Sequence, residues 1–546
     1  MSHPSPEPAP TPPIWPHCGH GTTTEDPVGC RGIHVPGHTA CLAHLDDADR
    51  DVYLAGLTPG AVIDHRGTTF TQPLLDALLD ALHDPATGHP RLGFAQFESA
   101  TFQGNAWFRS ATFQGGAGFG SATFEGDAGF GSATFQGGAG FGSATFQREA
   151  RFWSATFQGG AWFESATFQG NAWFEQAVFE RSVSLGPLVC AGHVVLSGAV
   201  FSSPVTLSFA ARRLECRRTR WSSTAELRLR YATVDFAHAV FEYPLTIAAE
   251  AEPFVLPNGQ TVAEQAVAGA PDSTVRIATL RGVDAAHLVL ADVDLSGCLF
   301  TGTVHLDQLR LEGLCFFDKV PLNTLRWHPV RFTQRRTLAE EHHWRASRPT
   351  AVRGWNVAVF GAGHVGPAQL APVYRALRKA FEDGKDEPGA ADFYYGEMEM
   401  RRHDRTGTSR AERGLLHGYW MLSGYGLRAS RALGWLAAAM LITIVLLMGF
   451  GLPKDSPKQE ATGTVPPGGG KITFEIDKAD PQNPTGNRFT GERFEKALNV
   501  TLNSVVFRSS GQDLTTTGTY IEMASRVTEP VLLGLAVLAV RNRVKR

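Results

Sequence analysis

Residues 100–119 read ATFQGNAWFRSATFQGGAGF, and the units in this stretch recur from Phe97 to Phe179. In each unit Ala precedes Phe by two positions, and successive Phe residues are alternately 5 and 6 positions apart. Residues i and i−2 lie on the same side of the chain only in an extended strand, so the pattern indicates β-structure. An 11-residue period also suits a helical supercoil, but paired glycines such as Gly115 and Gly116 would cost a helix about 1 kcal/mol each. The stretch therefore predicts short strands that bury Ala and Phe.

These A-x-F units and their glycine-rich corners resemble the pentapeptide-repeat family, whose units place a large apolar residue and a small one inside a four-sided coil. The resemblance implies a mainly β fold, a right-handed quadrilateral β-helix. The alternating spacing departs from the regular unit of the family and indicates two enlarged corners in each coil of about 22 residues. Weaker copies extend the predicted helix to about Phe316. The predicted core ladder contains Phe102, Phe113, Phe124, Phe135, Phe146, Phe157 and Phe168.

The 546 residues are too many for one core, and composition changes divide the chain into successive segments. The predicted segments are a Cys/His-rich segment at 1–50, a capping region at 51–93, the β-helix at 94–316 with an insertion at about 248–280, a helical linker at 317–431, a transmembrane helix at 432–452, an extracytoplasmic loop at 453–519, a second transmembrane helix at 520–540, and a basic tail at 541–546. Within the linker, the runs at 374–383 and 389–402 resemble a linker of membrane-anchored actinobacterial pentapeptide-repeat proteins.

Residues 432–452 carry no charge and are long enough to cross a hydrocarbon core of about 30 Å. Arginines before this segment and the basic tail after 520–540 predict a multi-pass protein of the cell membrane, with the N-terminus, the β-helix and the C-terminus in the cytoplasm. The second crossing contains Glu522, Arg526 and Glu529 on one helical face, which is expected to pack inward. Arg526 is expected to pair with both acids.

The N-terminal segment brings together residues that zinc prefers as ligands. Cys41 and His44 are spaced as a ligand pair, and Cys18 and Cys30 would complete a tetrahedral Cys₃His site. The alternative is a flexible arm with free thiols and solvated histidines. Seven dispersed cysteines are a poor disulfide framework and fit a reducing compartment.

Other motifs give little support for catalysis or for a nucleotide cofactor. The GxGxxG pattern at 361–366 is followed directly by Pro367, and no strand ending in an acid appears about 20 residues on. No serine-hydrolase, zincin, Walker or kinase signature is found, so an enzyme is not expected. Trp107, Trp162 and Trp173 occupy the outward position of A-x-F and are candidates for a binding face, although isolated exposed aromatic residues are common.

The leading functional hypothesis is a non-catalytic scaffold that holds a protein partner at the lipid bilayer. The alternative is a degenerate channel with two transmembrane helices, a homo-oligomer regulated by its β-helix, in which residues 495–507 resemble a pore helix. TTTGTY at 515–520 faintly resembles a potassium filter but lacks its G-Y-G core. The third hypothesis is the DNA mimicry against gyrase that is known in the family. Residues 98–181 contain seven acids and four arginines, too mixed a surface to imitate phosphates, so no nucleic-acid partner is expected.

Overall fold

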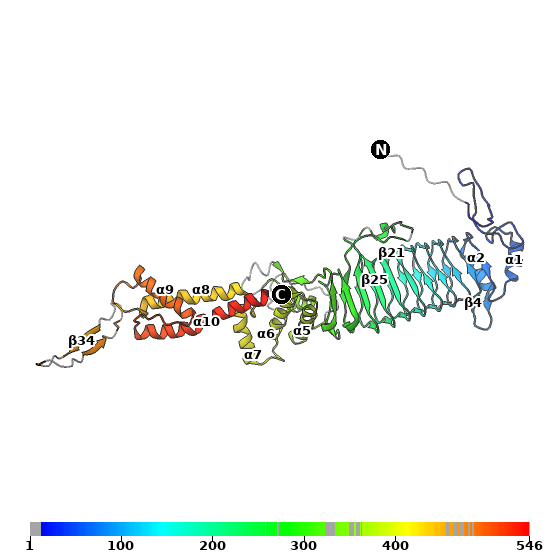
Figure 1. Ribbon diagram of the computed structural model, residues 1–546. Coiled ribbons are helices and arrows are strands. Elements are labelled where there is room, and N and C mark those ends of the chain that lie inside the picture. The colour runs from blue at the N-terminus through cyan, green and yellow to red at the C-terminus, as the bar shows by residue number, and fades with distance from the viewer. Residues whose placement is uncertain are drawn as a thin grey trace. The chain divides into compact units, whose positions relative to one another are not determined.

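Two-residue strands pair in parallel with the matching strands of the coils before and after them, and together they form a four-sided β-helix (Figure 1). Face 1 contains Ala95–Gln96 (β5), Ala117–Gly118 (β9), Ala139–Gly140 (β13) and Ala161–Trp162 (β17), and face 3 contains Ala106–Trp107 (β7), Ala128–Gly129 (β11), Ala150–Arg151 (β15) and Ala172–Trp173 (β19). Face 2 contains Thr101–Phe102 (β6), Thr123–Phe124 (β10), Thr145–Phe146 (β14) and Thr167–Phe168 (β18), and face 4 contains Thr112–Phe113 (β8), Thr134–Phe135 (β12), Thr156–Phe157 (β16) and Val178–Phe179 (β20). The predicted fold class is confirmed.

The computed structural model describes residues 12–544 apart from 257, 268, 270–271, 323–332, 349–353, 356–360, 362, 455–458, 464–466, 469–473, 479–480 and 483–484. The chain divides into two compact units, Met1–Lys385 and Asp386–Arg546, which are treated separately below.

The core of the β-helix is a set of phenylalanine columns. Phe135 is fully buried and stacks on Phe113 and Phe157, with 4.8 Å between ring centroids and an angle of 4° between ring planes in both pairs. Rings of opposite faces meet edge to face across the axis, as Phe130 and Phe141 do at 5.3 Å. Both arrangements suit the aromatic quadrupole and add to the stabilisation from apolar burial. Each coil therefore rests on the rings of the next.

The two spacings of the repeat produce two kinds of corner. At the shorter corner a serine adopts positive φ, as Ser121, Ser132 and Ser143 do at 54–58°. At the longer corner glycines stack closely, and a Cβ added to Gly137 would lie 2.3 Å from the carbonyl oxygen of Gly115. A Cβ at Gly137 would therefore collide with the backbone of the preceding coil, which explains the glycine at this position.

The first coil precedes the regular repeats. It contains Ile63–Asp64 (β1), which pairs with β5, and Thr69–Phe70 (β2), which pairs with β6. The preceding and following elements are Asp47–Ala55 (α1), Gln72–Ala81 (α2), His83–Asp84 (β3) and His89–Leu92 (β4). Helix α2 buries Leu75, Leu78 and Leu79, and β4 pairs with β8.

Later coils are less regular but keep the same stacking, and the solenoid has about ten turns in all. Its later strands include Val183–Val195 (β21), Val200–Phe201 (β22), Val205–Glu215 (β23), Arg220–Trp221 (β24), Ala225–Arg230 (β25), Thr233–Asp235 (β26), Val240–Phe241 (β27), Leu245–Ala249 (β28), Arg276–Thr279 (β29), Leu288–Ala291 (β30) and Arg310–Glu312 (β31). Between β28 and β29 the chain leaves the solenoid and packs Phe254 and Val267 against Val189 and Ala210.

A glutamate closes the far end of the β-helix. Helix Ala339–Ala346 (α4) places Glu340 so that one carboxylate oxygen accepts hydrogen bonds from the backbone N–H groups of Phe300, at 2.6 Å, and Thr301, at 2.9 Å. The Thr301 hydroxyl donates to the same oxygen at 3.1 Å. In earlier coils the next strand supplies such acceptors. Glu340 therefore replaces a missing coil at an edge that would otherwise invite pairing with another chain.

The neighbouring Glu341 is the centre of a buried ion cluster. It contacts Arg335 at 2.6 and 2.7 Å and Arg345 at 2.6 Å, and Tyr374 of helix Pro367–Asp383 (α5) donates to it. Burial alone would raise the pKa of Glu341, but the two guanidinium groups lower it to about 2. The cluster joins α4 to α5 within the first unit.

The second unit is helical. It contains Glu387–His403 (α6), Arg410–Ser423 (α7), Ala429–Leu446 (α8) with a π-helical turn at Leu447–Gly451 (η4), the hairpin Gln459–Gly463 (β34) and Phe474–Lys478 (β35), Gly491–Val505 (α9) and Thr516–Val544 (α10). Ala429–Gly451 and Thr516–Arg541 are long and apolar enough to cross a membrane, with mean hydropathy of 2.3 and 1.5. Residues 545–546 of the predicted basic tail lie outside the described residues.

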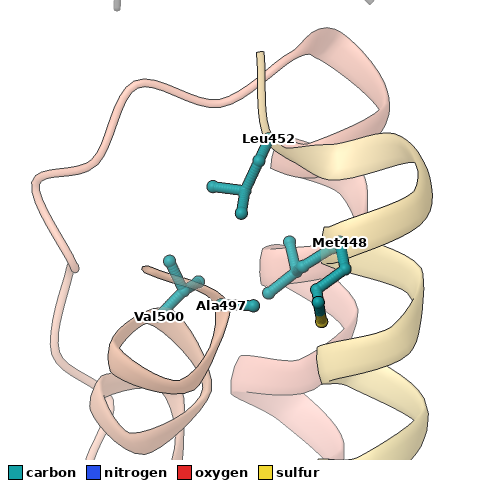
Figure 2. Packing of buried hydrophobic residues seen from close by; sticks show 5 residues of the cluster. Met448, Leu452, Ala497 and Val500 are labelled. Atoms are coloured by element: carbon teal, nitrogen blue, oxygen red, sulfur yellow. The ribbon is translucent and has the colours of Figure 1, made fainter. Parts of the chain in front are cut away.

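Helix α9 packs against the end of the first apolar helix (Figure 2). Leu447, Met448 and Leu452 form a buried cluster with Ala497 and Val500 of α9. Helix α9 covers most of the segment at 495–507 that resembles a pore helix. The helix begins at Gly491, earlier than expected, and ends at Val505.

The structure contradicts the resemblance of TTTGTY to a selectivity filter. Thr516–Tyr520 form the first turn of α10 and are helical, whereas a filter needs extended carbonyls. A Cβ on Gly518 would lie 2.3 Å from the carbonyl oxygen of Gly451, so this glycine permits a close crossing of η4 and α10. A Thr/Gly-rich run is equally typical of a helix start beside a close helix contact, which accounts for the faint resemblance.

Candidate metal centre and other predicted sites

A backbone turn brings the first two cysteines of the N-terminal segment together. The N–H of Cys18 donates to the carbonyl of Gly32, and the N–H of Cys30 donates to that of His20, at 2.9 and 3.0 Å. Gly19 and Gly29 both have φ of 62°, which a glycine adopts without strain. The following loop returns Cys41 to the same place, where a single turn links it to His44.

The four predicted ligand atoms lie within 4.8 Å of one another. Cys30 Sγ is 3.7 Å from Cys41 Sγ, and His44 Nδ1 is 3.3 Å from Cys41 Sγ and 3.5 Å from Cys18 Sγ. Tetrahedral zinc with usual bond lengths separates its sulfur and nitrogen ligands by about 3.5–3.8 Å. The sulfur separation is far beyond the bond length of about 2.05 Å in a disulfide. The donor set and its spacing therefore fit zinc.

The electrostatics of the cluster favour a bound cation. A hydrogen bond from Cys41 lowers the pKa of Cys30 to about 5, and the same hydrogen bond raises the pKa of Cys41. One thiolate therefore forms readily among these residues, and thiolate is the form that binds metal. The ring of His20 stacks on that of His44 at 4.2 Å and restricts the orientation of this ligand.

The segment that carries these residues is fastened to the first coil of the β-helix. The N–H of Ile33 donates to the carbonyl of Arg66 at 2.8 Å. Trp15 Nε1 donates to the carbonyl of Arg31 at 2.9 Å, and the Arg66 guanidinium lies 5.0 Å from the Trp15 ring centroid. The metal-binding candidates therefore belong to the N-terminal cap of the solenoid.

The three tryptophans proposed as a binding face do not lie together. Trp107 and Trp173 are on face 3, whereas Trp162 is on face 1. Their rings cover glycines of the repeat, because a Cβ on Gly129 would meet the Trp107 ring at 2.3 Å and one on Gly160 would meet the Trp162 ring at 2.7 Å. These residues form no single patch.

The predicted charge triad on α10 is only half formed. Arg526 contacts Glu522 at 2.9 Å, but Glu529 accepts a hydrogen bond from Thr443 of α8 at 2.9 Å instead. The expectation that Arg526 pairs with both acids was wrong. Helical side chains lean toward the N-terminus, so Arg526 reaches Glu522 and turns away from Glu529.

The GxGxxG motif at 361–366 is only partly described by the structure. Ala362 and the apolar run at 356–360 lie outside the described residues, while Gly366 is the N-cap of α5.

The sequence analysis missed Thr443 as the hydrogen-bond partner of Glu529. The available signal was a hydroxyl residue within an otherwise apolar span, facing a segment that contains acids.

Comparison with known proteins is consistent with this architecture. Residues 97–145, 119–167 and 141–186 match the family of pentapeptide repeats (9 copies). Neither a curated protein nor a solved structure matches the chain. The matched residues coincide with the regular Phe columns and their two-residue strands. Residues 97–186 of the β-helix therefore belong to the pentapeptide-repeat family.

Proposed function

We propose that the chain is a non-catalytic scaffold, anchored in the cell membrane by two helices, that presents its β-helix to a protein partner in the cytoplasm. The observation that carries the proposal is that one chain combines a solenoid filled by aromatic rings with two helices of membrane-spanning length. The interior of the solenoid has no room for a substrate between rings stacked at 4.8 Å. Recognition therefore takes place on its outer surface.

The distribution of positive charge supports the proposed orientation of the chain in the membrane. Arginines precede the first span, and an even number of crossings returns the chain to the starting side. The residues concerned are Arg401, Arg402, Arg405, Arg410, Arg413, Arg428 and Arg431. This charge supports a cytoplasmic β-helix.

One groove on the solenoid is the best candidate for the contact with the partner. It is lined by Trp153, Glu175, Glu215, Arg217 and His238, which lie on successive coils. Trp153 is 40% exposed. An exposed aromatic ring flanked by charged groups of both signs is typical of protein interfaces.

Site-specific photo-crosslinking in cells tests this proposal. A crosslinker at Ser197, inside the groove, is expected to capture one protein partner repeatedly. A crosslinker at Thr134 on face 4 serves as the matched control and is expected to capture none. Equal capture at both positions, or capture only of a second copy of the chain, would contradict the scaffold and favour the channel-like alternative.

The channel-like alternative rests on α9, which packs against both apolar helices as a re-entrant helix would. The helical state of Thr516–Tyr520 weakens it. DNA mimicry is weaker still, because arginines are mixed with the acids of the solenoid, and Arg151 pairs with Asp127 of the coil before it at 3.0 Å.

We further propose that Cys18, Cys30, Cys41 and His44 hold one structural zinc. Purified chain is expected to contain about one zinc per molecule, and the double variant Cys41→Ala, His44→Ala is expected to contain none. His20→Ala is the matched control, because His20 stacks on His44 without offering one of the four clustered atoms, and it should keep its zinc. Elemental analysis measures both. A metal content near zero in the unaltered protein, purified without chelator, would contradict the site.

A further inference from the structure

Helix α10 carries a polar stripe on the face that packs against α8 and α9. The stripe consists of Thr515, which directly precedes the helix, and Gly518, Glu522, Ser525 and Glu529 within it. Steps of three and four residues keep them on one side. Glu529 is fully buried, and Thr515 and Ser525 are 2% exposed. Such a face is unusual in an apolar span, because polar groups in hydrocarbon are costly unless they are used.

The stripe ends at the middle of the span. Glu529 lies thirteen residues after Thr516 and twelve before Arg541. Beyond it the same face continues with the buried apolar residues Leu532, Ala536 and Ala539. A polar route therefore leads from the loop between α9 and α10 to one carboxyl group at mid-membrane and stops there.

The neighbouring helices extend this polar route. Ser525 Oγ lies 3.0 Å from Ser504 Oγ of α9, and Thr501 of α9 is fully buried nearby along the same helix. Pro530 follows Glu529 and has no N–H to donate to the carbonyl of Arg526. Hydroxyl groups and a released carbonyl thus lie along the path to Glu529.

Glu529 itself is only half satisfied. Its Oε1 accepts from Thr443, while its Oε2 is buried and has no hydrogen-bond partner among the described residues. A carboxylate in apolar surroundings without a paired cation is strongly disfavoured relative to the neutral acid.

In the part of the chain that the structure describes, no cation is placed to pair with Glu529. On α10, Arg526 is bound to Glu522. Helix α8 has no charged residue after Arg431. The charged residues of α9 are Glu492, Arg493, Glu495 and Lys496, all in its first turns. Helices α6 and α7 also touch α10, and Arg401 pairs there with Glu412 and Arg402 with Glu399.

We propose that Glu529 is a proton-binding site within the membrane, which takes up a proton from water through the polar stripe on the loop side and releases it the same way. The carboxylate gains an O–H bond and loses its charge, and no other group changes. A metal ion is a poorer ligand, because hard cations take about six oxygen atoms, and among the described residues the Glu529 carboxylate has only Thr443 as a hydrogen-bond partner. The inference rests on the membrane insertion in the proposed function, not on the scaffold role.

Dicyclohexylcarbodiimide is a suitable probe, because a protonated carboxyl in an apolar site adds to it and a carboxylate does not. Full-length chain in lipid vesicles is treated at a series of pH values, and mass spectrometry locates the adduct. Modification is expected at Glu529 and to fall about tenfold per pH unit once the acid is deprotonated. Glu522, which Arg526 neutralises, should remain unmodified.

Three variants and one salt addition complete the test. Glu529→Gln should lose the adduct. Glu495→Gln, which changes an exposed acid of α9 outside the stripe, is the matched control and should keep it. Thr443→Val removes the donor that favours the charged form, so modification should persist to higher pH. Added sodium at constant pH should not protect Glu529. Protection by sodium, pH-independent labelling, or no labelling of wild-type chain would overturn the proposal. Protease accessibility of the 453–490 loop in the same vesicles shows insertion separately, so a failure of the membrane anchor is distinguishable.

Discussion

Phe135→Asp is expected to lower the free energy of unfolding of the β-helix by at least about 4 kcal/mol. The ring of Phe135 is fully buried between Phe113 and Phe157, and an aspartate there would lose both stacking contacts and leave an unpaired charge in an aromatic core. Urea denaturation of residues 1–385, which form one compact unit, followed by circular dichroism measures the change. The neighbouring coils should unfold with the altered one.

Thr134→Asp provides the matched control. Thr134 directly precedes Phe135 on the same strand, but its side chain points outward and is only partly buried. The same charge should therefore cost less than about 1 kcal/mol. If Phe135→Asp melted like the unaltered fragment, or if both variants were equally destabilised, the buried Phe ladder could not be what stabilises the solenoid.

Glu341→Gln is expected to cost about 3–5 kcal/mol, because it leaves Arg335 and Arg345 buried without their shared counter-charge. Glutamine has nearly the same size as glutamate, so the loss reports the charge and not a cavity. Denaturation of the 1–385 fragment at neutral pH measures it. Glu382→Gln is the control, since Glu382 is itself solvent-exposed and its pair with the half-buried Arg378 should contribute less than about 1 kcal/mol.

The dependence on pH gives a second measurement of the same cluster. The pKa of Glu341 falls from an ordinary 4.5 to about 2 in the folded protein, chiefly because Arg335 and Arg345 outweigh the effect of burial. A lowered pKa stabilises the fold above the ordinary value, and this stability is lost as pH falls toward 2. The unaltered fragment should therefore lose about 3 kcal/mol more than Glu341→Gln between pH 5 and pH 2. Parallel pH profiles for the two proteins would show that the carboxylate is not held in this way.

The β-helix could be predicted because every coil repeats the same local signal. Ala and Phe are two positions apart, glycines mark the corners, and each coil contacts only its neighbours. The ends of the solenoid carry no such signal. Glu340 lies far from Phe300 in the sequence, and only the folded chain brings the two together.

The spacing of the tryptophans held information that the prediction did not use. Trp107 and Trp173 are separated by three full coils, so they share a face. Trp162 is a half-coil from Trp173 and two and a half coils from Trp107, so it lies on the opposite face. The four proposed zinc ligands do lie together, unlike the three tryptophans. Cys41 and His44 are close in the sequence, and the backbone turn at Gly19 and Gly29 brings Cys18 and Cys30 to them. The partner of Glu529 could not be predicted, since spacing along α10 does not show which helix faces it.

The alternation of the two corners restricts how the length of this solenoid can change. A half-coil, such as the step from Ala95 to Ala106, adds one short and one long corner and turns every later strand to the opposite side of the axis, so that face 1 continues as face 3. A full coil, such as the step from Thr123 to Thr145, restores the original direction. A duplication or deletion that keeps a binding surface continuous must therefore consist of whole coils. A change by a half-coil would leave the Phe core intact while rotating everything after it by half a turn.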